Sequence, residues 1–260
     1  RSVLSRSLRK AIENRLECGE QAILFLNRRG YAGFVSCRSC GAVLKCPHCD
    51  VALTEHNNGR LVCHYCGYEQ PRGEKCPVCG SPYIGGFKAG TQQIEQVLHK
   101  NFPKARILRM DYDTTRAKGS YEKILSSFAA HAADILVGTQ MIVKGHDFPD
   151  VTLVGALAAD LSLNAADYRC AERTFQLLTQ AVGRSGRGTK PGEAIIQSYH
   201  PDHYSIRTAA EQDYEAFYQE EMAYRMLMDY PPAAHMLSVL VSGENEELLE
   251  QDSATFVSSH

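Results

Sequence analysis

Four kinds of segment are missing from this sequence. It has no apolar run near the ~18 residues that a membrane-spanning helix requires, and its first residues lack the apolar core of a signal peptide. No Gly-Lys dipeptide and no Asp-Glu dipeptide occur anywhere in it. The lack of Gly-Lys excludes a phosphate-binding loop of the form Gly-x-x-x-x-Gly-Lys-Ser/Thr. The lack of Asp-Glu excludes an acidic pair that holds magnesium beside a nucleotide. The absences predict a cytoplasmic protein with no membrane contact and no complete nucleotide site of its own.

Neither sign of charge is in excess. The chain has 28 Lys and Arg residues against 30 Asp and Glu residues, so its formal net charge is −2 at pH 7. That balance excludes a surface that is basic all over, and contact with nucleic acid would need a local basic patch. Apolar residues make up 44% of the chain, which is enough for a sizeable core. The sequence does not begin with Met and stops without a closing element, so we expect a fragment of a longer protein.

Continuous apolar runs alternate with segments of helical periodicity. Leu4, Leu8, Ile12 and Leu16 lie four residues apart, which predicts one apolar face of a helix. The run 21–26 then predicts a strand buried on both faces. The alternation predicts an α/β fold with a parallel sheet flanked by helices. We expect strands at 21–26, 106–111, 134–139, 151–160 and 193–199, and helices at 3–17, 91–99 (with Thr91 as N-cap), 119–130, 168–182 and 204–227.

A block of cysteines, glycines and prolines interrupts the alternation after its first strand. We therefore expect an inserted module at 37–88, between two parts of the sheet domain at 1–36 and 89–228. The prolines near 229–233 would break the last helix. A strand at 235–243 would then open a small, truncated C-terminal α+β domain within 229–260.

Eight of the ten cysteines form four Cys-x-x-Cys pairs in this block. Zinc takes four tetrahedral ligands, and two such pairs supply four thiolates with little backbone strain, so the block predicts two structural zinc ions. All-cysteine sites leave no open position for water and exclude zinc catalysis. A thioredoxin-like redox role is disfavoured because it needs only one dithiol. The pairs are Cys37/Cys40, Cys46/Cys49, Cys63/Cys66 and Cys76/Cys79, and the nearby His48, His56 and His64 are expected to be solvated.

The spacing of the pairs favours a nested arrangement. Thirteen residues separate Cys49 from Cys63, enough for a β-hairpin, so the second and third pairs would form a zinc ribbon. The first and fourth pairs would then close on each other and bring the two ends of the insertion together. In the cross-braced alternative, the first pair joins the third and the second joins the fourth.

Two further segments combine glycines with groups that bind phosphate. Residues 180–187 (QAVGRSGR) place two arginines on a glycine-rich turn after a helix, and guanidinium groups match phosphate geometry. A basic turn after a helix is the plainer interpretation. Residues 134–149 end a buried strand in a Gly-Thr turn and continue into a cluster of basic, glycine and acidic residues. Open α/β sheets bind ligands at the C-terminal ends of their strands, and an ordinary crossover is the alternative.

In order and spacing these segments resemble the second RecA-like lobe of superfamily 2 helicases. Residues 180–187 match its Gln-x-x-Gly-Arg-x-Gly-Arg motif six, residues 138–147 match motif five, and residues 25–31 (FLNRRGY) match motif four. The cysteine block directly after FLNRRGY narrows the resemblance to the replication-restart helicases of the primosome. The resemblance implies a 3′–5′ ATP-dependent DNA helicase whose first lobe, with the phosphate loop and the acidic pair, is not in this sequence.

The resemblance also implies a role for particular residues of motifs five and six, and it implies the nested pairing of the cysteines. The implied catalytic residues are Arg187, the arginine finger at the γ-phosphate, Arg184 beside it, and Gln180, which would couple nucleotide state to motion. The residues implied to line the nucleotide are Gly145, Asp147 and Gly183. The residues implied to contact DNA are Thr139, Gln140 and Lys144. One zinc ion would be held by Cys37, Cys40, Cys76 and Cys79, and the other by Cys46, Cys49, Cys63 and Cys66.

Two functions from different classes follow from these features. As a helicase lobe, the chain would bind ATP with Mg²⁺ only together with the missing first lobe, and its partners would be single-stranded and forked DNA. The resemblance adds primosome proteins and single-stranded DNA-binding protein as partners. The alternative is a non-catalytic zinc-ribbon module that docks DNA or protein on an α/β scaffold. Residues 180–187 discriminate between them, because a binding module has no use for two arginines aimed at a cleft.

Overall fold

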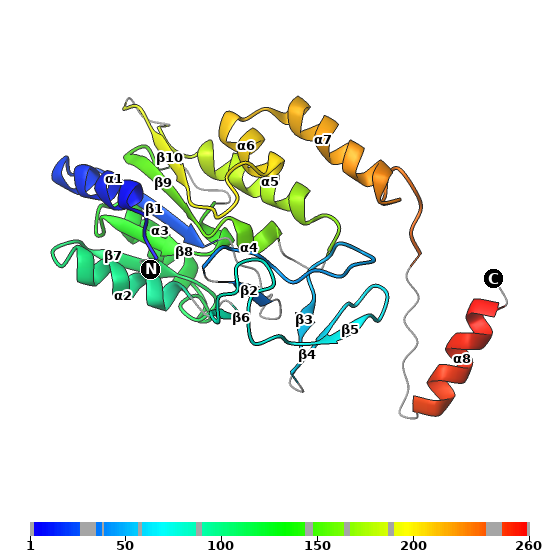
Figure 1. Cartoon of the computed structure of the whole chain (residues 1–260). Coiled ribbons are helices and arrows are strands. Elements are labelled where there is room, and N and C mark those ends of the chain that lie inside the picture. Colours follow the sequence, from blue (N-terminus) through cyan, green and yellow to red (C-terminus); the bar gives the residue numbers. More distant parts are fainter. Residues whose placement is uncertain are drawn as a thin grey trace. The chain divides into compact units, whose positions relative to one another are not determined.

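The computed structural model describes residues 3–26, 35–37, 39–56, 59–86, 90–143, 148–163, 167–186, 190–237 and 246–258. The chain divides into two compact units, residues 1–221 and 222–260. The first unit contains the sheet domain and the cysteine-rich insertion (Figure 1). None of the described helices is both long enough and apolar enough to cross a membrane.

Five parallel strands form the central sheet in the order β10-β9-β1-β8-β7. Strand β1 lies in the middle, where Leu24 pairs with Val137 of β8 on one side and with Gly155 of β9 on the other. This arrangement confirms the predicted parallel α/β fold. The strands are β1 (Gln21–Leu26), β7 (Ile107–Met110), β8 (Ile135–Gly138), β9 (Val151–Leu157) and β10 (Glu193–Ile196).

Side chains of β1 alternate between two hydrophobic clusters, one on each face of the sheet. Ile23 and Phe25 belong to the first cluster, whereas Ala22, Leu24 and Leu26 belong to the second. All six residues of the strand are buried. The continuous apolar run is therefore explained by burial on both faces, as predicted.

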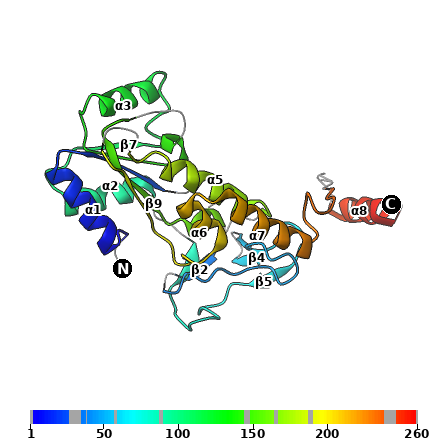
Figure 2. The same cartoon turned by 90° about the horizontal axis from the view of Figure 1, so that it is seen from above.

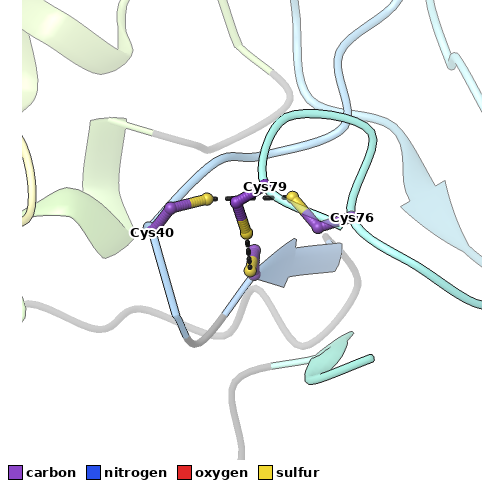
Figure 3. Close-up of side chains that lie close together, drawn as sticks. Cys40, Cys76 and Cys79 are labelled. Atoms are coloured by element: carbon purple, nitrogen blue, oxygen red, sulfur yellow. Dashed lines mark hydrogen bonds between the residues drawn. The ribbon is translucent and has the colours of Figure 1, made fainter. Parts of the chain in front are cut away.

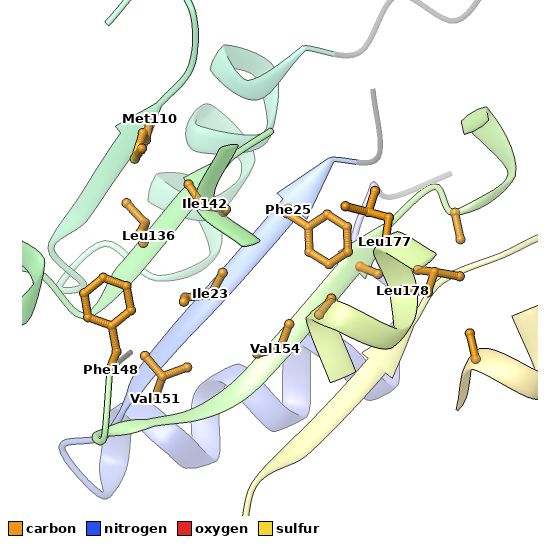
Figure 4. Packing of buried hydrophobic residues seen from close by; sticks show 14 of the residues in the cluster. Ile23, Phe25, Met110, Leu136, Ile142, Phe148, Val151, Val154, Leu177 and Leu178 are labelled. Atoms are coloured by element: carbon orange, nitrogen blue, oxygen red, sulfur yellow. The ribbon is translucent and has the colours of Figure 1, made fainter. Parts of the chain in front are cut away.

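Helices cover both faces of the sheet (Figures 1 and 2). Helices α1 (Arg6–Glu17) and α2 (Thr91–Asn101) pack their buried residues into the second cluster. Figure 4 shows the first cluster, where Leu177 and Leu178 lie over Phe25 and Val154. The helices that contribute to it are α3 (Ser120–Ala129), α5 (Cys170–Val182), α6 (Tyr204–Glu211) and the start of α7 (Tyr214–Leu227); a short α4 (Asp160–Leu163) follows β9.

One predicted cap is wrong. Gly90, with φ −105° and ψ 173°, is the N-cap of α2, and Thr91 is the first helical residue. The hydroxyl of Thr91 donates instead to Oδ2 of Asp111 at 2.5 Å, and both side chains are buried. The amide of Thr114 donates to the other carboxylate oxygen of Asp111 at 3.0 Å, so the Thr91 hydroxyl completes the pairing of a buried carboxylate and is not used as a cap.

The cysteine-rich insertion leaves the sheet domain after β1 and returns before α2. Its two ends form an antiparallel pair, β2 (Val35–Cys37) with β6 (Ile84–Gly86), in which Cys37 pairs with Ile84. Within it, β3 (Thr54–Glu55), β4 (Arg60–Val62) and β5 (Glu69–Pro71) form a small antiparallel sheet. The β3–β4 pair confirms the hairpin that was predicted between Cys49 and Cys63. Residues 35–86 are called the zinc module below.

The second unit holds the end of α7 and helix α8 (Glu246–Ser258). Its Pro231–Pro232 peptide bond is cis, and the helix ends before it, as the prolines predicted. A strand at 235–243 is not seen in the described residues 235–237, and the rest of that segment lies outside the described residues.

Gln21 donates hydrogen bonds to two buried backbone carbonyls inside the first unit, so its substitution should change the free energy of unfolding. Its Nε2 donates to the carbonyl oxygens of Phe128 and Ala133, both at 2.8 Å, and the residue is 3% exposed. A buried group left unpaired costs about 1–3 kcal/mol, so Gln21→Met should lower the free energy of unfolding by at least about 2 kcal/mol. Urea denaturation measures the change. The exposed Gln96→Met on α2 is the matched control, and an equal effect of both would contradict the role of Gln21.

Candidate functional site

Each Cys-x-x-Cys pair forms the same backbone turn. The amide of the residue after the second cysteine donates to the carbonyl of the first, at 2.8–3.0 Å in all four turns. That residue has a positive φ, which favours glycine. Three of the four are the glycines Gly41, Gly67 and Gly80, and the fourth is Asp50 at φ 51°. Asp tolerates this conformation, and the Asp50 carboxylate pairs with Lys45 at 3.0 Å.

The structure brings the eight cysteines together in the nested arrangement. The sulphurs of Cys37, Cys40, Cys76 and Cys79 lie within 4.8 Å of one another, as do those of Cys46, Cys49, Cys63 and Cys66. Figure 3 shows the first cluster, where Cys40 Sγ lies 3.7 Å from Cys76 Sγ and Cys37 Sγ lies 3.6 Å from Cys79 Sγ. Sulphurs at ~2.3 Å from one tetrahedral ion would lie about 3.8 Å apart. Both clusters therefore fit a zinc ion.

Burial and the close packing of the sulphurs shift the pKa values of the thiols in both directions. Burial, and then the neighbouring Cys66 and Cys63, raise the pKa of Cys49 to about 12. Burial alone would raise the pKa of Cys37, but the backbone N–H groups of Cys40 and Ser39 lower it to about 6. Four neighbouring thiolates would repel one another, and a bound dication would offset that repulsion and so stabilise the deprotonated form of the thiols.

The other metal-binding side chains nearby take no part in these clusters. Among the described residues, groups that could hold a metal ion contain cysteines alone. His48 packs edge-on against Tyr68 with ring centroids 5.5 Å apart, and His56 lies 5.3 Å from His64. The remaining cysteines, Cys18 and Cys170, lie outside the module as free thiols.

The residues predicted at DNA follow β8 at the carboxyl edge of the sheet. Thr139 comes directly after Gly138, and Gln140 begins a short 3₁₀ helix, η1 (Gln140–Val143). Thr139 and Gln140 are half-buried, and Ile142 anchors the segment in the core at 2% exposure. The segment is thus held against the sheet while its first residues stay accessible.

The motif-six turn lies at the opposite, amino edge. Gly183 caps α5 by donating to Thr179 O at 3.0 Å. Gly186, at φ 74°, donates to the carbonyl of Val151 at the start of β9, at 3.3 Å. A side chain on Gly186 would collide with the backbone of Gly192, whose Cα would lie 2.8 Å from the added Cβ. Glycine is therefore required, and the turn is fixed to the sheet.

Motif six contacts the chain beyond the end of motif five, at Val151. The segment after β8 starts at the carboxyl edge and reaches the amino edge at Val151, where Gly186 binds. Gln180 is exposed on the last turn of α5, and Arg184 is half-buried. The predicted residues Arg187, Lys144, Gly145 and Asp147, and residues 27–31 of FLNRRGY, lie outside the described residues.

Sequence reasoning missed the residues that attach the zinc module to the sheet domain. Tyr65 Oη accepts a hydrogen bond from the backbone N–H of Tyr168 at 3.1 Å. Gly41 packs against Tyr199, where an added Cβ would lie 2.5 Å from that residue's Cβ. The glycine signalled a turn, but no sequence pattern signals either partner, because the contacts join distant parts of the chain.

Two family models match the chain. The model of the PriA DNA helicase Cys-rich region matches residues 46–71, and that of the helicase conserved C-terminal domain matches residues 84–189. Two similar proteins are both named replication restart protein PriA. The one from Bacillus subtilis is 55% identical over 94% of this chain and 30% of its own length. The one from Thermotoga maritima is 40% identical over 91% of this chain and 32% of its own length.

A solved structure shares weaker similarity. The C-terminal domain of the DEAD-box protein Dbp5 is 12% identical, with a TM-score of 0.40 over 81% of each chain. The assignment therefore rests on the two PriA relatives, on the Cys-rich region model and on two cysteine clusters in the module. These similarities place the chain in the family of the replication restart protein PriA, and it spans about a third of the length of the relatives it matches.

Proposed function

We propose that this chain is the second motor lobe of an ATP-dependent 3′–5′ DNA helicase that acts in replication restart and primosome assembly at stalled forks. The observation that carries the proposal is the motif-six turn, which is fixed by Gly186 to the start of β9. A turn so constrained suits arginines that must meet a phosphate in one geometry. Family membership supports the same function.

In this proposal ATP with Mg²⁺ binds between this lobe and a first lobe that supplies the phosphate loop. Arg187 contacts the γ-phosphate with Arg184 beside it, Gln180 links nucleotide state to motion, and Gly145, Asp147 and Gly183 line the nucleotide. ATP draws the lobes together and hydrolysis releases them, so each cycle moves single-stranded DNA across Thr139, Gln140 and Lys144. The protein would act in the cytoplasm.

The two zinc ions have a structural role in this proposal. Each would be held by one of the cysteine clusters, and neither would have an open position for a reacting water. The inserted module, which was predicted to span 37–88, would then bind fork DNA, primosome proteins or single-stranded DNA-binding protein. Cys46→Ala with Cys49→Ala should accordingly lower unwinding or partner loading more than ATP turnover, and equal losses would indicate that the module only maintains the fold.

The 260-residue chain alone is expected to hydrolyse no ATP above background, with or without DNA. Its sequence contains no Gly-Lys and no Asp-Glu dipeptide, so it cannot hold the phosphates and magnesium, and an arginine finger acts only across a completed site. A coupled ATPase assay would compare it with a full-length parent protein on forked DNA. Robust DNA-stimulated turnover by the chain alone would refute the expectation, and no turnover by the parent would favour the zinc-ribbon binding module.

A further inference from the structure

The zinc module touches the start of α5 through the turn of its second cysteine cluster. Tyr65 lies between Cys63 and Cys66, and its Oη accepts from the amide of Tyr168 at 3.1 Å. Tyr168 comes two residues before α5. The Tyr65 hydroxyl thus ties the zinc module to the segment that leads into this helix.

The turn of the first cluster makes a second contact with the sheet domain. Gly41 follows Cys40, and its backbone lies directly on Tyr199, which comes after β10. A Cβ on Gly41 would lie 2.5 Å from Cβ of Tyr199 and 3.3 Å from Nε2 of His200. Since even a methyl group would not fit, the module and the domain are packed without a gap here.

Both contact points belong to firmly held backbone. The buried carboxylate of Asp160 accepts from the amides of Tyr199 at 2.9 Å and His200 at 3.2 Å. The Asp167 carboxylate pairs with Arg169 at 3.0 Å and with Arg173 at 2.7 Å. Displacement of the module would therefore be passed on to these segments instead of being absorbed by loose loops.

Helix α5 connects one of these contacts to the motif-six turn. It runs from Cys170 at the carboxyl edge to Val182 at the amino edge, about 20 Å for its 13 residues. One face is buried in the core, and Phe175 stacks on Phe217 of α7 with ring centroids 4.1 Å apart. A packed helix can move as one body, which gives a shift at Tyr168 a route to Gln180 and Arg184 at its far end.

We propose that Tyr65 and Gly41 dock the zinc module so that force on the module is transmitted along α5 to the motif-six turn. Tyr65 is a positioning residue: it acts on Arg184 and its neighbours through the helix and contacts no reactant. DNA or a partner pulling on the module would thereby adjust ATP hydrolysis at the far edge of the sheet. The inference rests on the proposed helicase function. It adds the route by which force on the zinc module would influence ATP hydrolysis.

Amide exchange in the 260-residue chain tests the docking contact without any activity. Tyr65→Phe removes only the hydroxyl, and the Tyr168 amide should exchange about 2–10-fold faster, as the loss of one hydrogen bond predicts. Tyr83→Phe is the matched control, because Tyr83 lies in the same module and is 69% exposed. Zinc content should remain two per chain in both. An unchanged exchange rate of the Tyr168 amide in Tyr65→Phe would show that the Tyr65 hydroxyl does not protect this amide, and would overturn the proposal.

A full-length parent protein tests the transmission. Gly41→Ala forces the module off Tyr199, whereas Gly80→Ala has a similar left-handed φ penalty at a turn of the same cysteine cluster with nothing within 4 Å of the added Cβ. The difference between the two isolates the effect of docking. We expect Tyr65→Phe and Gly41→Ala to lower the base pairs unwound per ATP by at least about 2-fold, with DNA-free turnover and the KM for ATP unchanged.

The outcomes separate this inference from the proposed function. A parent protein with no DNA-stimulated ATP turnover would contradict the proposed helicase function itself. An active parent whose unwinding per ATP is the same in Tyr65→Phe, Gly41→Ala and Gly80→Ala would overturn the inference alone. Parallel loss of zinc, turnover and unwinding in Tyr65→Phe would show a structural role and would also overturn it.

Discussion

Arg187→Ala in a full-length parent protein should lower DNA-stimulated ATP turnover by about 10³–10⁵-fold, the range that arginine fingers contribute. The finger would stabilise charge that develops on the γ-phosphate in the transition state, so the loss should appear in kcat and leave the KM for ATP little changed. Steady-state turnover on forked DNA over a range of ATP concentrations measures both. Single-stranded DNA binding should persist, because Thr139 and Gln140 lie at the edge of the sheet opposite Gly186.

The control for this experiment is Arg9→Ala, an exposed arginine on α1. It removes the same charge from the same sheet domain, and turnover should remain within about 2-fold of wild type, as surface substitutions rarely disturb a fold. A loss below 10-fold in Arg187→Ala would contradict the finger. The chain would then be better described as a zinc-ribbon binding module on an inherited motor scaffold.

The sheet domain was predictable because its signals are local. Burial on both faces makes β1 a continuous apolar run, and helical periodicity marks α1 from its buried Leu8 and Ile12. The cysteine spacing likewise favoured the nested pairing, since a hairpin between Cys49 and Cys63 leaves the outer pairs to meet each other. In each case neighbouring residues carry the information that determines the structure.

What the sequence could not predict depends on residues far apart in the chain. Thr91 binds Asp111 instead of capping its helix, a choice determined by the buried carboxylate of another element. Tyr65 meets Tyr168 across 103 residues, and nothing near either tyrosine signals it. The motif-six turn was expected only as a glycine-rich turn. It is held in place by Val151 at the start of β9 and by Gly192 directly before β10, and both lie outside the motif.

Removing both zinc ions should unfold the zinc module while the sheet domain stays folded. Among the described residues of the module, five aliphatic side chains are buried in its core cluster, and a core of that size cannot offset the conformational entropy of ordering the whole module. Structural zinc contributes on the order of 10–16 kcal/mol to small domains at pH 7. The sheet domain has larger clusters on both faces of its sheet and does not depend on the metal. The aliphatic residues are Val35, Val51, Leu53, Leu61 and Ile84.

Hydrogen exchange with and without a strong chelator measures this difference segment by segment. Protection of β3–β5 should be lost, β1 and β8 should keep theirs, and the amide of Tyr168 should open because Tyr65 no longer reaches it. Thiol titration should show eight newly reactive cysteines, and Cys18→Ser should still hold two zinc ions, since that exposed thiol lies outside both clusters. Since the ligands must be deprotonated, the same unfolding should follow as the pH is lowered. Full protection of β3–β5 in chelator would show that the protein core, not the metal, holds the module together, and would leave Tyr65 docked without zinc.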